Sequence, residues 1–298
     1  MKNLLVLLLA FVLLCSPAYA LTFTDASGRE VSVENPQRVV SLYNSYGEAW
    51  LSAGGELVGS IADTFDGGRL DEGVQNLGSH TTPNMELLFS LSPDFVLLSS
   101  DIASHREIAP LLEESMIPCA FFSTPDYGSY MEMMRLFCEL TGRDDLYQRQ
   151  LETVQLPIEV MISEGQTLSS KPTALLSRAN SITVKCKNSE TTVAGNILRD
   201  MGFVNLADGN SALCESVSME SVIIEDPDYI FVVLQGSSSE AAQNNLASVL
   251  TNNPAWNTLT AVREGRFYIL DRDLFHYHPN ERWSESYQFI LDILKGEN

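Results

Sequence analysis

Two histidines near the carboxyl end of the chain have the spacing of paired metal ligands. His276 and His278 lie two positions apart in the aromatic segment Leu274–Asn280. In an extended loop, side chains at positions i and i+2 point to the same side. Neutral imidazole is the commonest protein ligand of metal ions. The spacing therefore predicts that His276 and His278 face one site, where they either ligate a metal centre or only pack and hydrogen-bond within the loop.

Polar and aromatic side chains also follow predicted strands in the first half of the chain. Val39–Leu42 is a short apolar strand, and Tyr43 and Tyr46 come directly after it. Asp101 follows a second apolar strand in the same way. Ligands of open α/β sheets bind beyond the carboxyl ends of the strands. We therefore expect these three side chains at a ligand pocket, with simple packing of the tyrosines against their loop as the alternative.

The elements that position these residues form an internal repeat. Asn84–Leu98 and Ser218–Val232 each begin with Met-Glu at the start of a short helix, and Pro-Asp follows seven residues after the Glu. A run of β-branched and aromatic residues comes next in both copies, which is typical of a buried parallel strand. Two such halves predict two α/β lobes.

The segment Arg143–Leu168 separates the two copies and is predicted to be one long connecting helix. Its apolar residues recur every three or four positions, as on one stripe of a helix, and polar residues fill the opposite side. Pro157 lacks a backbone donor, so we expect a kink just before it; two helices that meet at Pro157 are the alternative. The predicted domains are an N-terminal lobe (21–142), the connecting helix (143–168) and a C-terminal lobe (169–298).

Residues 1–20 have the pattern of a signal peptide. Lys2 supplies the positive start, Leu4–Leu14 the apolar stretch, and Ala18-Tyr19-Ala20 the small-x-small cleavage site. The apolar stretch is too short for a permanent membrane helix. Cys15 allows a second interpretation, a lipid-anchored protein, although Leu14 stands where such signals have a small residue. We expect an exported protein that is released, or membrane-anchored if Cys15 is acylated.

Four cysteines follow this segment, and export places them where disulfides can form. Cys119 and Cys138 lie in the first half of the chain, and Cys186 and Cys214 lie in the second. One disulfide in each lobe is possible in an oxidising compartment. Four buried thiols are the alternative, because cysteine packs as a small apolar residue.

The charge and the motifs of the chain narrow the class of function. The net charge is −21, which disfavours a nucleic-acid partner and attraction to an anionic membrane surface. The sequence contains no nucleophile elbow, no His-Glu-x-x-His and no phosphate loop. We therefore expect a binding protein and not an enzyme.

Together these elements resemble the substrate-binding proteins of ABC importers for iron–siderophore complexes, haem and vitamin B12. The resemblance covers residues 22 to 296 and rests on these motifs in this order: Asp25 with Gly28-Arg29, Arg38–Leu42, Asn84-Met85-Glu86 with Pro93-Asp94, Met219-Glu220 with Pro227-Asp228, and Trp256 with Ala261-Val262-Arg263 and Gly265-Arg266. It implies a monomer of the class III periplasmic binding protein architecture. In this α/β fold, two Rossmann-like lobes with parallel-rich sheets are joined by one long helix.

The resemblance also implies where the partners bind. One surface glutamate of each lobe, Glu86 and Glu220, would dock on the permease dimer, although each could also stabilise the positive end of its short helix. Arg178 has the planar fork that suits a bidentate anion, and Trp283 could belong to the core. The ligand-binding residues that the resemblance implies are Tyr43, Tyr46, His80, Asp101, Arg178, His276, Tyr277, His278 and Trp283.

The expected ligand is a metal chelate, namely a ferric siderophore, haem or a corrinoid, and no intrinsic cofactor is expected. His276 and His278 would then reach the metal of the bound ligand. Direct binding of haem or a metal ion through these two residues and His80 is the alternative, and an exported chelatase-like enzyme is a less favoured one. The scarcity of basic residues counts against a strongly anionic siderophore, which keeps haem and corrinoid open.

Overall fold

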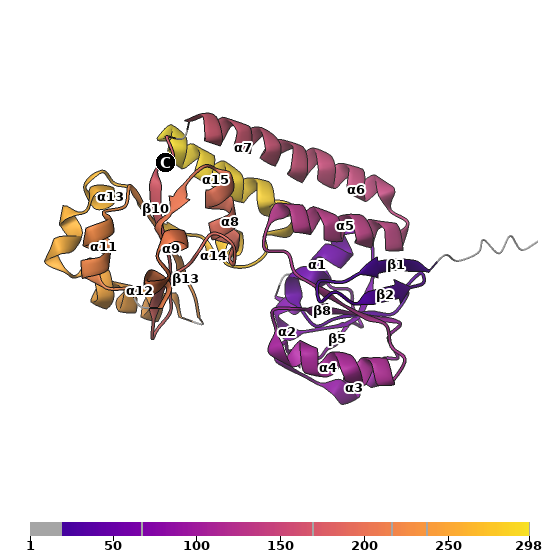
Figure 1. Ribbon diagram of the computed structural model, residues 1–298. Helices are drawn as coiled ribbons and strands as arrows, with labels where there is room; N and C mark the ends of the chain where they lie inside the picture. The colour runs from indigo at the N-terminus through magenta and orange to yellow at the C-terminus, as the bar shows by residue number, and fades with distance from the viewer. Residues whose placement is uncertain (1–19, 67, 169, 216, 237, 298) are drawn as a thin grey trace, which may run out of the picture.

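The computed structural model describes residues 20–66, 68–168, 170–215, 217–236 and 238–297. The chain forms two α/β lobes that lie side by side and are joined by one long helical run (Figure 1). The predicted signal peptide, Ala20 apart, and Cys15 lie outside the described residues. Within these residues, no helix is long and apolar enough to cross a membrane.

The N-terminal lobe is built on a parallel sheet with the strand order β5-β4-β3-β8-β9. Its strands β3 and β8 are fully buried, as their apolar runs predicted, and so is β9 at the edge of the sheet. Two small antiparallel hairpins accompany the sheet. The strands are β1 (Leu21–Thr24), β2 (Glu30–Val33), β3 (Val39–Ser41), β4 (Leu57–Ser60), β5 (Gln75–Asn76), β6 (Gly78–Ser79), β7 (Thr82–Pro83), β8 (Phe95–Ser99) and β9 (Cys119–Phe122). The helices are α1 (Asn44–Ser52), α2 (Ala62–Phe65), α3 (Met85–Ser90), α4 (Ala103–Glu114) and α5 (Tyr127–Thr141).

The C-terminal lobe is built on a second sheet, with the order β11-β10-β13-β14 and with β12 beside β10. Only β11 runs antiparallel to its neighbour among these strands. The strands are β10 (Thr173–Ala179), β11 (Val184–Cys186), β12 (Val204–Asn205), β13 (Tyr229–Leu234) and β14 (Phe267–Leu270). The helical elements are α8 (Val193–Asp200), α9 (Leu206–Gly209), α10 (Ser211–Glu215), α11 (Met219–Glu225), α12 (Ser239–Leu246), η2 (Ala247–Thr251), η3 (Pro254–Thr258), α13 (Thr260–Arg263), α14 (Arg272–Phe275), η4 (Asn280–Arg282) and α15 (Trp283–Lys295).

The connecting helix is continuous where the sequence predicts a kink. It consists of α6 (Asp144–Gln150), the π-helical segment η1 (Leu151–Gln155) and α7 (Leu156–Leu168). The π-helical turn ends just before Pro157, whose missing N–H cannot support a regular α-helical hydrogen bond there. The predicted position of the irregularity near Pro157 is thus correct, but the helix continues through the π-helical segment instead of breaking. The domain boundaries drawn on either side of this helix stay a prediction.

A second segment of the chain also links the lobes. After α14 the chain leaves the C-terminal lobe and contacts α1 of the N-terminal lobe, where the Asn280 side-chain amide donates to the Ser45 carbonyl at 3.0 Å. Helix α15 then returns along α7 (Figure 1). A salt bridge of 2.8 Å between Lys295 and Glu164 joins these two helices near the C-terminus.

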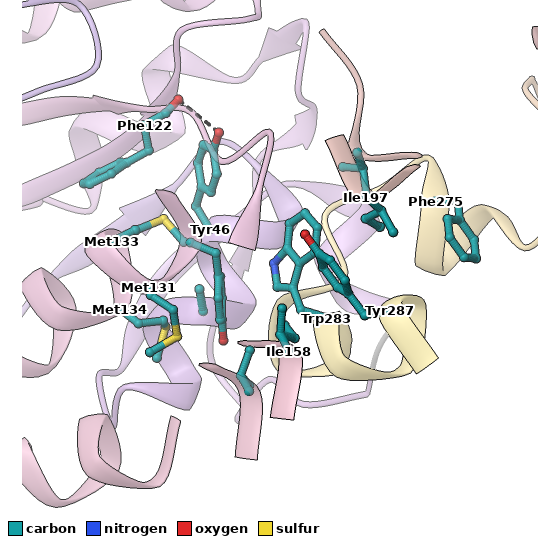
Figure 2. Packing of buried hydrophobic residues seen from close by; sticks show 14 of the residues in the cluster. Tyr46, Phe122, Met131, Met133, Met134, Ile158, Ile197, Phe275, Trp283 and Tyr287 are labelled. Atoms are coloured by element: carbon teal, nitrogen blue, oxygen red, sulfur yellow. Dashed lines mark hydrogen bonds between the residues drawn. The ribbon is translucent and has the colours of Figure 1, made fainter. Parts of the chain in front are cut away.

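The hydrophobic core is continuous from one lobe to the other. One cluster of buried residues includes members of both lobes, of the connecting helix and of α15, and two further clusters belong to one lobe each. Figure 2 shows members of the shared cluster: Tyr46, Phe122, Met133, Ile158, Ile197, Phe275, Trp283 and Tyr287. Separation of the lobes would expose this shared apolar surface, including that of α15, to water. Its burial therefore stabilises the relative position of the two lobes.

Candidate ligand-binding site between the lobes

Tyr43 is the residue of the N-terminal lobe that best meets the expectation for a ligand contact. It precedes α1 at the carboxyl end of β3, and its ring is half-buried between Tyr46 and His278, at centroid distances of 4.7 and 5.7 Å. Burial, with the negative charge of Asp101 as a further cause, raises the pKa of Tyr43 to about 12. The phenol therefore stays protonated at neutral pH and is available as a hydrogen-bond donor.

Two of the predicted ligand residues lie in the core instead. Tyr46 is 0% exposed, and its hydroxyl donates to the Phe122 carbonyl at 3.0 Å (Figure 2). Trp283 is also 0% exposed, as the first residue of α15. Neither side chain has surface to offer a ligand in this structure, so their placement at the pocket is corrected. Tyr46 follows the strand end as predicted, but it lies on the buried face of α1.

In the N-terminal lobe, His80 is half-buried and Asp101 is exposed. His80 Nδ1 is 3.5 Å from Asp63 Oδ2. The loop that carries His80 is fixed by His105, a fully buried residue of α4 that the sequence did not single out. The Ser99 N–H donates to His105 Nδ1 at 2.9 Å, so Nε2 carries the proton and donates to the His80 carbonyl at 2.9 Å. His105 thus holds this loop against the end of β8.

The C-terminal lobe contributes a group of cations, which we call the basic hairpin: Arg178, Lys185 and Lys187. Arg178 of β10 pairs directly with Lys185 of β11, and Lys187 follows two positions later, on the same side of the strand. Burial lowers the pKa of Arg178, and burial together with the positive charges of Arg178 and Lys185 lowers the pKa of Lys187. Three cations thus lie close enough to repel one another.

None of the acids that the structure describes neutralises the centre of the basic hairpin. Among the described residues, none forms a hydrogen bond or an ion pair with the half-buried Arg178 guanidinium. A buried charge without a partner is costly, and such groups are retained where a ligand supplies the counter-charge. Arg178 was predicted from its type and position. The two lysines were missed, although the alternation Val184-Lys185-Cys186-Lys187 is a strand pattern with both lysines on one face.

His276, Tyr277 and Arg272 lie next to the basic hairpin. Arg272 donates to the Tyr277 hydroxyl at 2.6 Å and to the Gly236 carbonyl at 3.0 Å. Burial, followed by the charges of Arg178 and Arg272, lowers the pKa of His276 to about 4. His276 Nδ1 is buried without a hydrogen-bond partner among the described residues. The neutral ring can therefore accept a hydrogen bond or ligate a metal.

His278 has a different task from His276. Its Nδ1 is 2.9 Å from Thr124 Oγ1 of the N-terminal lobe, and its ring packs against Tyr43 and Tyr46. The loop is not extended as predicted, because His276 has helical backbone angles (φ −112°, ψ −49°). The i, i+2 rule therefore does not apply. His278 anchors the second link between the lobes, and the described residues include no group of three or more His, Cys, Asp or Glu side chains that could hold a metal ion.

The docking residues predicted in the two lobes have matching local structures. Glu86 lies in the first turn of α3, which the Asn84 side chain caps. Glu220 lies in the first turn of α11, which the Ser218 side chain caps. Both glutamates are exposed, and the two helices lie in different lobes (Figure 1). This geometry is consistent with docking and with stabilisation of the helix ends.

The four described cysteines are unpaired in the structure. Cys119, Cys138 and Cys186 are buried, and Cys214 is half-buried. Cys186 Sγ is 3.5 Å from Ser177 Oγ. The structure therefore has the arrangement of thiols, and not the disulfide in each lobe that export would permit.

Acid should destabilise the folded protein as the pH falls from about 6.5 to about 4. Burial lowers the pKa of His105, His276 and His278 to about 4 each, whereas histidines of an unfolded chain titrate near 6.5. Between these values the unfolded chain binds protons that the folded chain does not, so the free energy of unfolding falls as the pH falls. The contribution of these histidines to that loss levels off below about pH 4. We expect a loss of about 1–3 kcal/mol for each ring.

Guanidinium unfolding at pH 7 and pH 4.5 measures this loss. His278→Gln is the matched variant, because glutamine can keep a hydrogen bond to Thr124 but does not titrate. The variant should lose less stability on acidification than the wild type. An equal loss in both proteins would mean that His278 does not contribute to the acid sensitivity.

Comparison with known proteins gives a consistent result. The family model described as periplasmic binding protein matches residues 39–274. The Fe(3+)-citrate-binding protein YfmC of Bacillus subtilis is 25% identical over 284 residues, with 91% of this chain and 84% of that protein covered. The Fe(3+) dicitrate-binding periplasmic protein FecB of Escherichia coli is 22% identical, with 87% of this chain and 85% of that protein covered.

Solved structures share the fold over nearly the whole chain. The catecholate-siderophore binding protein VctP of Vibrio cholerae has a TM-score of 0.74 at 16% identity, covering 93% of this chain and 100% of that chain. Staphylococcus aureus SirA complexed with staphyloferrin B has a TM-score of 0.70 at 18% identity, covering 93% and 98%. The haem-binding protein RhuT of Roseiflexus sp. RS-1 has a TM-score of 0.68 at 17% identity, covering 88% and 98%.

Proposed function

Because the chain belongs to the periplasmic binding protein family, we propose that it captures an anionic ferric complex between its lobes and delivers it to the permease of an ABC importer. Membership of this family places the protein outside the cytoplasm. The single observation that carries the cargo proposal is the unpartnered guanidinium of Arg178 within the basic hairpin. A carboxylate-rich ferric chelate would supply the missing counter-charge.

The basic hairpin changes the balance between the possible cargoes. The small number of basic residues counted against an anionic siderophore, but three of them are gathered on one edge of one sheet. Local charge and not net charge determines what binds at a site. YfmC and FecB, whose names state ferric citrate binding, agree with a carboxylate ligand. No observation on the described residues favours a corrinoid.

The ligand contacts that we propose come from both lobes. Tyr43 donates a hydrogen bond from the N-terminal lobe, and Arg178 forms a bidentate pair with a carboxylate from the C-terminal lobe. Lys187 and Arg272 add positive charge, and Tyr277 is 44% exposed beside Arg272. We propose that His80 and Asp101 lie at the rim of the site. Tyr46 and His278 pack against the Tyr43 ring and so hold it in place.

Haem is the second candidate cargo, and one observation favours it. The unpartnered Nδ1 of His276 is a free imidazole nitrogen, and imidazole is a common axial ligand of haem iron. The structural similarity to RhuT is compatible with this alternative. A haem-binding site would need His276 to reach the iron, whereas a citrate-type complex would need Arg178. The same two residues therefore distinguish the cargoes.

Glu86 and Glu220 are proposed to dock the loaded protein on the permease. The variant Glu86→Lys/Glu220→Lys should lower ligand uptake by cells at least tenfold, because each glutamate would face a basic pocket. Its affinity for the ligand in solution should stay within twofold of the wild type. The matched control is Glu107→Lys/Glu240→Lys, which reverses exposed acids of one helix in each lobe. Uptake that survives the first variant would remove the docking proposal.

The leader and the oligomeric state complete the proposal. We propose that cleavage after Ala20 releases a monomer. A lipid anchor at Cys15 is the second possibility, and the relative YhfQ of Bacillus subtilis is named a putative lipoprotein. The named relatives are binding proteins, which favours binding over a chelatase activity. Mass spectrometry of the exported protein would distinguish an N-terminus at Leu21 from an acylated Cys15.

A further inference from the structure

The outer face of the connecting helix carries apolar side chains that the lobes do not use. The inner face of α7 buries Ile158 and Met161 in the shared core. On the outer face, Leu156 is 54% exposed and Val160 is 66% exposed. One helical turn separates these two residues, so they form a single ridge. The predicted polar face of the helix is thus interrupted in its second half.

Hollows of substantial size flank this ridge. A cavity of about 820 Å³ lies between α7 and α15, where Phe289 and Leu291 join Leu156 and Val160 in its lining. A second cavity of about 550 Å³ adjoins it along α7 and shares the ridge residues. We call the two together the α7–α15 groove. It is large enough to receive several apolar side chains.

The rim of the α7–α15 groove is acidic. Its carboxylates are Glu152, Glu159, Glu164, Glu285 and Asp292, and Lys295 is the one cation among the described residues that line it. Lys295 already pairs with Glu164 at 2.8 Å. No described residue forms an ion pair with Glu152 or Glu159. The groove therefore combines an apolar floor with uncompensated negative charge.

We propose that the α7–α15 groove docks an amphipathic, basic segment of a partner protein. Apolar side chains of the segment would cover the Leu156–Val160 ridge, and its lysines or arginines would pair with Glu152 and Glu159. A second copy of this chain would bring the same acidic rim and a net charge of −21. An anionic membrane surface would be repelled in the same way. Helices α7 and α15 both run between the lobes. The bound segment would therefore contact the connecting helix and the second segment that links the lobes.

Fluorescence anisotropy with a defined peptide tests this proposal. The probe is a labelled peptide of about 18 residues that places leucines on one face of a helix and lysines on the opposite face. Leu156→Gln/Val160→Gln should weaken its binding at least tenfold, and Glu152→Gln/Glu159→Gln should weaken it and reduce its salt dependence. The control Ile182→Gln/Ile224→Gln changes two exposed apolar residues of the C-terminal lobe and should stay within twofold of the wild type. Circular dichroism checks that each variant is folded.

Several results would overturn the proposal. Equal binding of a peptide with the same composition in scrambled order would mean general attraction to an acidic protein. If the control variant weakened peptide binding as much as Leu156→Gln/Val160→Gln does, the binding would not be specific to the α7–α15 groove. A dimer in sedimentation that Leu156→Gln/Val160→Gln dissociates would make a second copy the occupant. Binding to the chain from residue 21 but not to the full precursor would make the leader the occupant.

Discussion

With Arg178 changed to glutamine, the protein should bind ferric citrate about ten- to a hundredfold more weakly than the wild type. A hydrogen bond to a charged group contributes about 1.5–3 kcal/mol, and each 1.4 kcal/mol is about tenfold in affinity. Isothermal titration calorimetry of the purified protein measures the change. Arg178→Lys should recover only part of the loss, because an ammonium group cannot make the bidentate contact.

Stability distinguishes this role from a structural one. Since the Arg178 guanidinium has no partner among the described residues, its replacement should not lower the free energy of unfolding. Arg135→Gln is the control, because Arg135 is exposed on α5 and pairs with Glu139 at 3.3 Å. The control should change neither affinity nor stability. If Arg178→Gln binds ferric citrate like the wild type, the basic hairpin is not the ligand site.

Changing Trp283 to alanine should lower the free energy of unfolding by about 3–5 kcal/mol, the range for a large aromatic residue removed from a core. Trp283 is fully buried at the start of α15, within the cluster that both lobes share (Figure 2). Guanidinium unfolding, followed by circular dichroism, measures the loss.

The milder variant Trp283→Phe tests whether the residue also touches the ligand. Phenylalanine keeps most of the apolar contact, so this variant should fold with a smaller loss of stability. Its affinity for the ligand should stay within about threefold of the wild type, because the indole has no exposed surface. A large loss of affinity with unchanged stability would return Trp283 to the ligand site.

The two lobes were predictable because the pattern that specifies them is local. Met-Glu, Pro-Asp and the apolar run after them occur twice, and each copy forms a short helix and a buried parallel strand. The burial of Trp283 could also be predicted from the sequence. It begins the stripe Trp283, Tyr287 and Ile290, whose spacing of four and three residues predicts a buried helix face.

The second link between the lobes was not predictable in this way. It depends on Asn280, a non-glycine residue with a positive φ of 52°, whose side chain bonds to the Ser45 carbonyl of the other lobe. Such a conformation depends on its tertiary partners and leaves no periodic signal in the sequence. The same holds for His278, which pairs with Thr124 across the lobes. Its residue type and its spacing from His276 made it resemble a metal ligand.

The basic hairpin lies between these two cases. The alternation of Lys185 and Lys187 marks one face of a strand, but only the register of β10 and β11 brings Arg178 beside them. The net charge of the whole chain gave no sign of this cluster of cations, because 39 acidic residues outnumber 18 basic ones. The position of charge in the fold, and not its sum, carries the information about the ligand.

Ligand titration of the chain from residue 21 onward, followed by tryptophan fluorescence, tests the central claim most directly. The ligands are ferric citrate, a ferric carboxylate siderophore, haem and cobalamin. The basic hairpin predicts saturable binding of a ferric carboxylate complex at micromolar concentration or below, at least tenfold tighter than haem or cobalamin. Tighter binding of haem or cobalamin, or no binding of any ferric carboxylate complex, would contradict it.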